Sequence, residues 1–192
     1  MRVFVAALMF VWFVLGGLTV PASASDIPAV PQNIAAPPPG TVALCLRNPS
    51  LCQHAEAATA PVSMQDEILA TNVEVNKRIQ SRNLEDNPYK DGADASNWQM
   101  LAPGGVGDCK DYTLTKLFLL DWLGVPRGAM RLAVVHVPGS SDKLNHAILI
   151  VRIGGTDYVL DNLTDEMRPL ASVAYRVLAV QNPTEQVWIA AN

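Results

Sequence analysis

The chain lacks an excess of basic residues. Its 192 residues include 14 Lys and Arg against 18 Asp and Glu, a formal net charge of −4. No stretch gathers Lys or Arg into a basic stripe, which argues against nucleic acid or anionic lipid as a partner. No internal repeat is present either.

Long apolar runs are also scarce. One run of 16 residues, Val3–Leu18, follows Arg2 and precedes Ala22-Ser23-Ala24, the small-x-small pattern of a signal-peptidase site. This run is short for a membrane span, and no second one follows. We expect a secretory signal over residues 1–24, with a retained N-terminal anchor as the alternative.

Cysteine is scarce as well, with three in the chain. An exported protein meets an oxidising compartment, in which neighbouring thiols pair. We expect a disulfide between Cys45 and Cys52, and bridges from Cys109 to either of them are the less economical alternatives. Cys109 is then the odd thiol, and it is either an inert buried residue or a reactive one.

Composition divides the rest of the chain in two. Residues 25–40 contain five prolines among alanines and predict an extended, poorly ordered leader. Residues 41–192 are long enough for one domain with an ordinary core.

Helical patterns come first in this domain and extended patterns follow. Apolar spacing predicts a helix over residues 65–80, and a second helix starts at Cys109, with Asp108 as its N-cap, and stops at Gly124. Strands are predicted at residues 130–137, 144–153, 158–161, 174–180 and 186–190. Helices followed by an antiparallel meander indicate an α+β fold.

Cys109 is the candidate nucleophile. Free amides and the macrodipole at a helix N-terminus favour the thiolate, which is the nucleophilic form of the side chain. Lys110 adds favourable charge, whereas Asp108 and Asp111 oppose it. Because the position alone has a modest effect, a base is needed to activate the sulfur.

His146 and Asp161 are the candidate base and its partner. A lone histidine in an apolar strand is more often a core residue, but a buried carboxylate is costly unless it is paired. A two-residue turn at Gly154–Gly155 places Asp161 diagonal to His146 on the same face, whereas a three-residue turn without a bulge separates them. We expect Asp161 to orient the imidazole, with its other ring nitrogen toward Cys109.

Other polar residues are weaker candidates for a catalytic role. Asn162 points to the opposite face by strand alternation and ranks second as the orienting group. His54 and His136 are interpreted as structural. Gln99 is a candidate oxyanion donor, but the backbone N–H of Cys109 is a better one.

Several segments together resemble a known family. They are Gly107-Asp-Cys-Lys-Asp-Tyr112, Leu123-Gly-Val-Pro126, Asn145-His-Ala-Ile-Leu149 and Tyr158-Val-Leu-Asp-Asn-Leu-Thr-Asp165. They are similar to the bacterial transglutaminase-like cysteine peptidases of the LapG type, over roughly residues 42–180. The resemblance implies a papain/transglutaminase-like core, with the nucleophile at the N-terminus of a helix packed on an antiparallel sheet. It also implies a Cys109–His146–Asp161 triad.

The resemblance implies a function and its partners. Characterised members are periplasmic hydrolases that cut a surface adhesin, so we expect a protein substrate and a thioester intermediate. An inner-membrane receptor for a cyclic dinucleotide restrains some members, and we expect a regulatory partner of this kind. Calcium is associated with acidic residues flanking the cysteine, but the position commonly held by Glu is Lys110 here. Because an ammonium repels calcium, we expect calcium dependence to be weak or absent, and we expect no other cofactor.

Two alternative functions stay open. A protein-glutamine acyl transferase uses the same triad with an amine in place of water. A non-catalytic binding module would keep the fold and sequester a partner, and Lys110 is the feature that keeps this alternative open. Cys109→Ala separates the alternatives, because it abolishes the activity of an enzyme and leaves that of a binding module intact.

Overall fold

The computed structural model describes residues 34–81, 96–140, 145–184 and 187–190. The expected signal over residues 1–24 and most of the expected leader lie outside these ranges. Among the helices within them, none has the length and apolar character that a membrane span requires.

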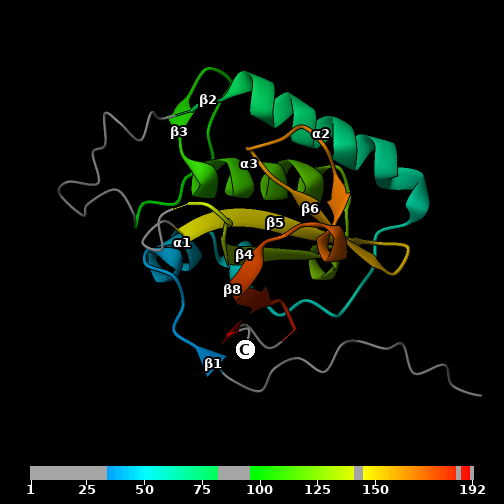
Figure 1. Cartoon of the computed structure of the whole chain (residues 1–192). Coiled ribbons are helices and arrows are strands. Elements are labelled where there is room, and N and C mark those ends of the chain that lie inside the picture. Colours follow the sequence, from blue (N-terminus) through cyan, green and yellow to red (C-terminus); the bar gives the residue numbers. More distant parts are fainter. Residues whose placement is uncertain (1–33, 82–95, 141–144, 185–186, 191–192) are drawn as a thin grey trace, which may run out of the picture.

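An antiparallel sheet forms the centre of the described chain (Figure 1). Its strand order is β1-β9-β8-β4-β5-β6-β7. The strands are β1 (Ile34–Ala35), β4 (Met130–His136), β5 (Asn145–Ile153), β6 (Thr156–Leu160), β7 (Arg168–Pro169), β8 (Arg176–Asn182) and β9 (Val187–Ala190). The chain runs as a meander from β4 to β7 and then crosses back, so that β8 pairs with the other side of β4. The predicted α+β class is confirmed, whereas the crossover was not predicted.

Two helices lie in successive layers above this sheet (Figure 1). Helix α3 (Cys109–Trp122) packs on β5, and helix α2 (Gln65–Arg78) packs on α3. Smaller elements complete the fold: α1 (Thr41–Arg47), a parallel pair formed by β2 (Gln80–Ser81) and β3 (Val106–Gly107), and 3-10 turns η1 (Pro49–Cys52), η2 (Val62–Met64), η5 (Arg127–Ala129) and η6 (Leu170–Ser172).

Helix α3 begins and ends where its sequence indicates. The Asp108 carboxylate accepts the Lys110 N–H at 3.2 Å, and the Asp111 carboxylate accepts the Asp108 N–H at 3.2 Å. This reciprocal capping box satisfies free amides at the start of the helix. Gly124, with a φ of 89°, provides the left-handed turn beyond the last residues. The caps therefore fix Cys109 at the first helical position.

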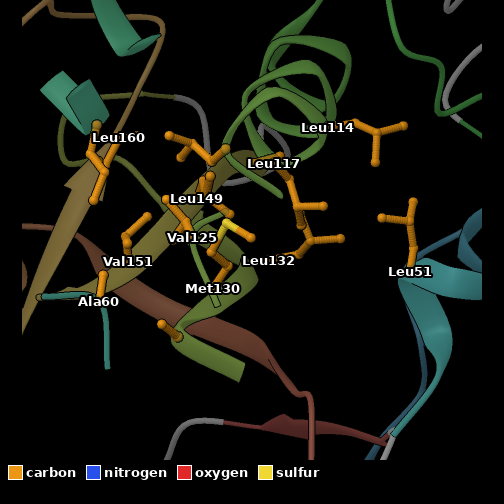
Figure 2. Close-up of a cluster of buried hydrophobic side chains, with 14 of the residues drawn as sticks. Leu51, Ala60, Leu114, Leu117, Val125, Met130, Leu132, Leu149, Val151 and Leu160 are labelled. Carbon is orange, nitrogen blue, oxygen red and sulfur yellow. The ribbon is translucent and has the colours of Figure 1, made fainter. Parts of the chain in front are cut away.

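Apolar clusters cover both faces of the sheet. The larger cluster includes Leu114 and Leu117 of α3 together with Leu132 and Leu149 of the sheet (Figure 2). The smaller cluster on the other face includes Ile148, Ile150, Val159 and the partly buried Tyr175. Strand β5, which carries His146, is thus held from both sides.

The disulfide and the leader complete the packing. Cys45 and Cys52 are bonded, as predicted, and join α1 to η1. Ile34–Ala35 pair with the edge strand β9, and the Pro39 carbonyl accepts the Trp98 indole N–H at 3.0 Å. The end of the segment expected as a poorly ordered leader is therefore packed against the domain, because β9 offers it free backbone groups.

Candidate active site

The β5–β6 hairpin brings His146 and Asp161 together. Gly154 and Gly155 form the predicted two-residue turn, with φ angles of 54° and 94° that suit glycine. Ile153 consequently pairs with Thr156, and the predicted register is confirmed. His146 Nε2 lies 2.7 Å from Asp161 Oδ1.

The Asp161 carboxylate is buried, with 1% of the residue exposed. Its Oδ1 also accepts the Leu163 N–H at 3.0 Å, and its Oδ2 accepts the Tyr175 hydroxyl at 2.6 Å. Burial alone would raise the pKa of Asp161. The hydrogen bond and charge of His146, together with the bonds from Tyr175 and Leu163, outweigh burial and lower it. The carboxylate is therefore ionised at neutral pH.

The pKa of the His146 imidazole is raised, so the ring is protonated at neutral pH. Burial lowers its pKa, but hydrogen bonds with Asp161 and Cys109, together with the charges of both, raise it to about 9. Because Asp161 engages Nε2, the ring nitrogen left for Cys109 is Nδ1. The ring therefore carries a proton beside Cys109 at neutral pH.

Thr113 ties the nucleophile to the strand that carries the histidine. Cys109 is a partly exposed free thiol at the start of α3. The Thr113 hydroxyl lies 2.8 Å from the Cys109 carbonyl and 3.1 Å from the carbonyl of Ala147, the neighbour of His146. Helix and strand are thus joined at the point where Cys109 and His146 meet.

An acidic turn surrounds Cys109. Lys110 Nζ lies 2.6 Å from Asp108 Oδ2 and 3.8 Å from Asp111 Oδ2. Burial raises the pKa of Asp111, Lys110 opposes this, and Asp108 adds to it. Asp111 Oδ1 also accepts the Gln99 N–H at 3.1 Å. Gly107 is required here, since a Cβ on it would lie 2.9 Å from the Asp111 Cβ.

Two asparagines of α2 hold the segment that follows Asp161. Asn76 Nδ2 lies 2.9 Å from the Asp161 carbonyl, 3.0 Å from the Thr164 carbonyl and 3.0 Å from Asp165 Oδ1. Asn72 Nδ2 contacts the carbonyls of Thr164 and Asp165 at 3.4 and 3.1 Å. Helix α2 therefore fixes the backbone from which the Asp161 side chain projects.

A buried lysine lies on the side of α3 that faces this segment. Lys116 is 1% exposed. Burial lowers its pKa to about 7, although the charges of Asp161 and Asp165 act in the opposite direction. Burial thus makes the charged form of Lys116 costly in the fold.

The structure brings three of the sequence-predicted residues together and places the others elsewhere. Cys109, His146 and Asp161 meet between α3 and the β5–β6 hairpin. His54 Nδ1 bonds with the Thr184 carbonyl, and His136 ends β4. The Gln99 N–H donates to Asp111 Oδ1, and the Gln99 side chain stays the weaker of the two candidate oxyanion donors.

Sequence reasoning missed Tyr175, Thr113 and the contacts of the two asparagines. A buried tyrosine hydroxyl needs a partner, which was the available signal for Tyr175. The partner itself depends on how β8 returns to the sheet.

Comparisons with known proteins identify the family and the fold of the chain. A family model described as bacterial transglutaminase-like cysteine proteinase matches residues 31–192. Solved structures of Legionella pneumophila LapG share the fold: one is 20% identical with a TM-score of 0.53, covering 66% of this chain and 69% of that chain. A calcium-bound form is 21% identical (TM-score 0.54, 66% and 69% covered), and an EGTA-treated form 20% identical (0.54, 67% and 68%). No curated protein matches the chain.

Proposed function

The chain belongs to the bacterial transglutaminase-like cysteine proteinases, and we propose that Cys109, His146 and Asp161 are the catalytic triad of this cysteine peptidase. The observation that carries the proposal is the 2.7 Å contact between His146 Nε2 and Asp161 Oδ1, on an imidazole that also bonds with Cys109. Geometry of this kind provides a nucleophile, a proton carrier and an orienting carboxylate.

The first half of the reaction acylates the enzyme. The Cys109 thiolate attacks the carbonyl carbon of the substrate peptide, a C–S bond forms, and the carbonyl electron pair moves to oxygen. The Cys109 N–H, one of the free amides at the start of α3, donates to this oxyanion. As the C–N bond breaks, the imidazolium of His146 gives its Nδ1 proton to the leaving amine. A thioester on Cys109 remains.

The second half releases the product. His146, now neutral, takes a proton from a water molecule whose oxygen attacks the thioester carbon. The C–S bond breaks, a carboxylic acid leaves, and the thiolate–imidazolium pair is restored. Asp161 accepts the Nε2–H throughout and keeps Nδ1 directed at the sulfur.

We place this activity in the periplasm, on a protein substrate such as a surface adhesin. The resemblance to LapG-type peptidases, the signal-like segment over residues 1–24 and the Cys45–Cys52 disulfide support export. Cleavage of the signal would release residues 25–192, in which the leader precedes the peptidase domain. An inner-membrane regulatory protein is the second partner that the resemblance supports.

The described residues do not fit calcium. Calcium takes six to eight oxygen ligands and favours several carboxylates. No group of three or more His, Cys, Asp or Glu residues within the described ranges could hold a metal. The buried carboxylates of Asp108 and Asp111 are occupied by the Lys110 ammonium. We therefore propose that the peptidase works without a metal or any other cofactor.

Proteolysis by the purified mature chain tests the proposed function. Residues 25–192 would be incubated with bacterial surface proteins, and new peptide N-termini would be identified by mass spectrometry. We expect cleavage by the wild type and none by Cys109→Ala or His146→Ala, both of which should stay folded. Incorporation of an amine into glutamine side chains, without new N-termini, would favour the acyl transferase. A stable complex that Cys109→Ala retains, with no turnover by the wild type, would favour the binding module.

A further inference from the structure

Three charged side chains are buried in the turn that carries the candidate nucleophile. Asp108, Lys110 and Asp111 are 7%, 5% and 0% exposed. Charged groups this deeply buried are tolerated where they are paired and hydrogen-bonded. The arrangement of this turn therefore depends on how its charges are balanced.

Both carboxylates accept backbone hydrogen bonds within or next to the turn, in addition to pairing with the ammonium of Lys110. Asp108 accepts the Lys110 N–H, and Asp111 accepts the N–H groups of Asp108 and Gln99. The contact between Asp111 and the Gln99 N–H joins the start of α3 to the segment around Gln99. If repulsion separated the two carboxylates, both the start of α3 and the segment around Gln99 would move.

Lys110 is the group that holds the carboxylates together. Its Nζ reaches Asp108 Oδ2 at 2.6 Å and Asp111 Oδ2 at 3.8 Å, and its charge counteracts the rise in the pKa of Asp111 that burial causes. A cation in the first turn of a helix is unfavourable toward the macrodipole. The placement of Lys110 is therefore explained by the two carboxylates and not by the helix.

The same two carboxylates would attract a divalent cation if the ammonium were absent. An ammonium and a calcium ion compete for the same oxygen atoms and repel each other. We propose that Lys110 is a built-in cation that replaces calcium in this chain, and that the identity of residue 110 decides whether the nucleophile's turn needs a metal. This inference deepens the proposed metal-independent function. It rests on that function only in the experiment that measures the reactivity of Cys109.

The test compares the wild type with Lys110→Glu, which supplies a third carboxylate, and Lys110→Gln, which removes the charge alone. Lys77→Glu on α2 is the matched control, since Lys77 is exposed. Calcium binding would be measured by calorimetry on the mature chain, which requires no catalytic activity. Labelling of Cys109 by iodoacetamide would be measured in EGTA and in calcium, with magnesium as the ion control.

We expect the wild type and Lys77→Glu to bind no calcium and to label at the same rate in EGTA and in calcium. Lys110→Glu should bind calcium and should label at least about tenfold faster with calcium than in EGTA. Lys110→Gln should label more slowly than the wild type in EGTA and recover in part with calcium. If Lys110→Glu does not fold, the labelling rates of Lys110→Gln in EGTA and in calcium decide whether the inference holds.

Calcium binding by the wild type would overturn the inference, as would a Lys110→Glu variant that folds and ignores calcium. If Cys109 of the wild type labels like an ordinary thiol, the proposed triad fails. The calorimetry still decides the inference about Lys110 in that case.

Discussion

The Tyr175 hydroxyl donates to Asp161 at 2.6 Å, through the carboxylate oxygen that does not contact His146. The tyrosine and histidine rings meet edge to face, with centroids 6.4 Å apart. Asp161 is therefore held at both oxygens, and its orientation toward the imidazole is set by Tyr175, the residue before β8, as well as by the β5–β6 hairpin.

Tyr175→Phe should slow the peptidase without unfolding it. The substitution removes one hydrogen bond to an ionised carboxylate, a contact that is typically worth about 1.5–3 kcal/mol. Since His146 and Leu163 still hold the other oxygen, we expect a decrease of about tenfold in kcat/KM. Tyr158→Phe in β6 is the control, and an equal effect of both substitutions would contradict a specific role of Tyr175.

The pair of His146 and Asp161 should stabilise the fold within a defined pH range. Folding raises the pKa of His146 from 6.5 to about 9 and lowers that of Asp161 below 3.8. The stability from His146 is therefore complete below about pH 6.5 and is lost as the pH rises through about 9. The stability from Asp161 is complete above about pH 4 and is lost at lower pH.

Urea unfolding of the wild type and His146→Ala would measure this contribution. We expect the difference in the free energy of unfolding to shrink by on the order of 3 kcal/mol between pH 6 and pH 10. A difference that stays constant with pH would show that folding does not raise the pKa of His146.

Protonation of Lys116 should destabilise the fold, whereas protonation of His146 stabilises it. Folding lowers its pKa from 10.5 to about 7, so the unfolded chain binds this proton more tightly. The cost to the folded state is complete below about pH 7 and disappears as the pH approaches 10.5. Lys116→Met should therefore gain most stability relative to the wild type near pH 6. The difference in the free energy of unfolding should narrow by about 1.4 kcal/mol per pH unit above pH 7.

Denaturation at three pH values would check this, with Lys77→Met as the exposed control. A gap that does not change with pH would mean that Lys116 keeps its usual pKa in the fold.

The Cys45–Cys52 disulfide should stabilise the domain and leave the reaction unchanged. It closes a short loop, with a sequence separation of 7, which corresponds to about 2–3 kcal/mol in the chain-entropy account. We expect the Cys45→Ser, Cys52→Ser double variant to lose stability by this amount and to label at Cys109 at the wild-type rate. A slower rate of labelling in the folded variant would show that the α1–η1 region contributes to the site.

Local signals predicted the parts of the site that lie close together in the sequence. Asp108 and Gly124 bound the helix, and the Gly154–Gly155 turn sets a register that places His146 beside Asp161. Each of these features depends on a few neighbouring residues, and their geometry is nearly independent of the rest of the chain.

Long-range contacts could not be predicted in the same way. Tyr175 reaches Asp161 because β8 crosses back to β4, and Asn76 reaches the Asp161 carbonyl across 85 positions of the sequence. In the sequence, Lys110 is a favourable charge beside Cys109, a residue that disfavours calcium and a feature that keeps a binding module open. Its pairing with Asp108 depends on side-chain burial, which periodicity does not reveal.

The rate at which Cys109 reacts with iodoacetamide across pH tests the central claim most directly. At pH 6 an ordinary thiol is less than about 1% ionised and reacts slowly, whereas we expect a Cys109 sulfur paired with His146 to react rapidly. We expect rapid labelling of the wild type at pH 6, at least about tenfold slower labelling of His146→Ala, and no effect of EGTA. Labelling that follows an ordinary thiol in both proteins would contradict the proposed Cys109–His146 pair.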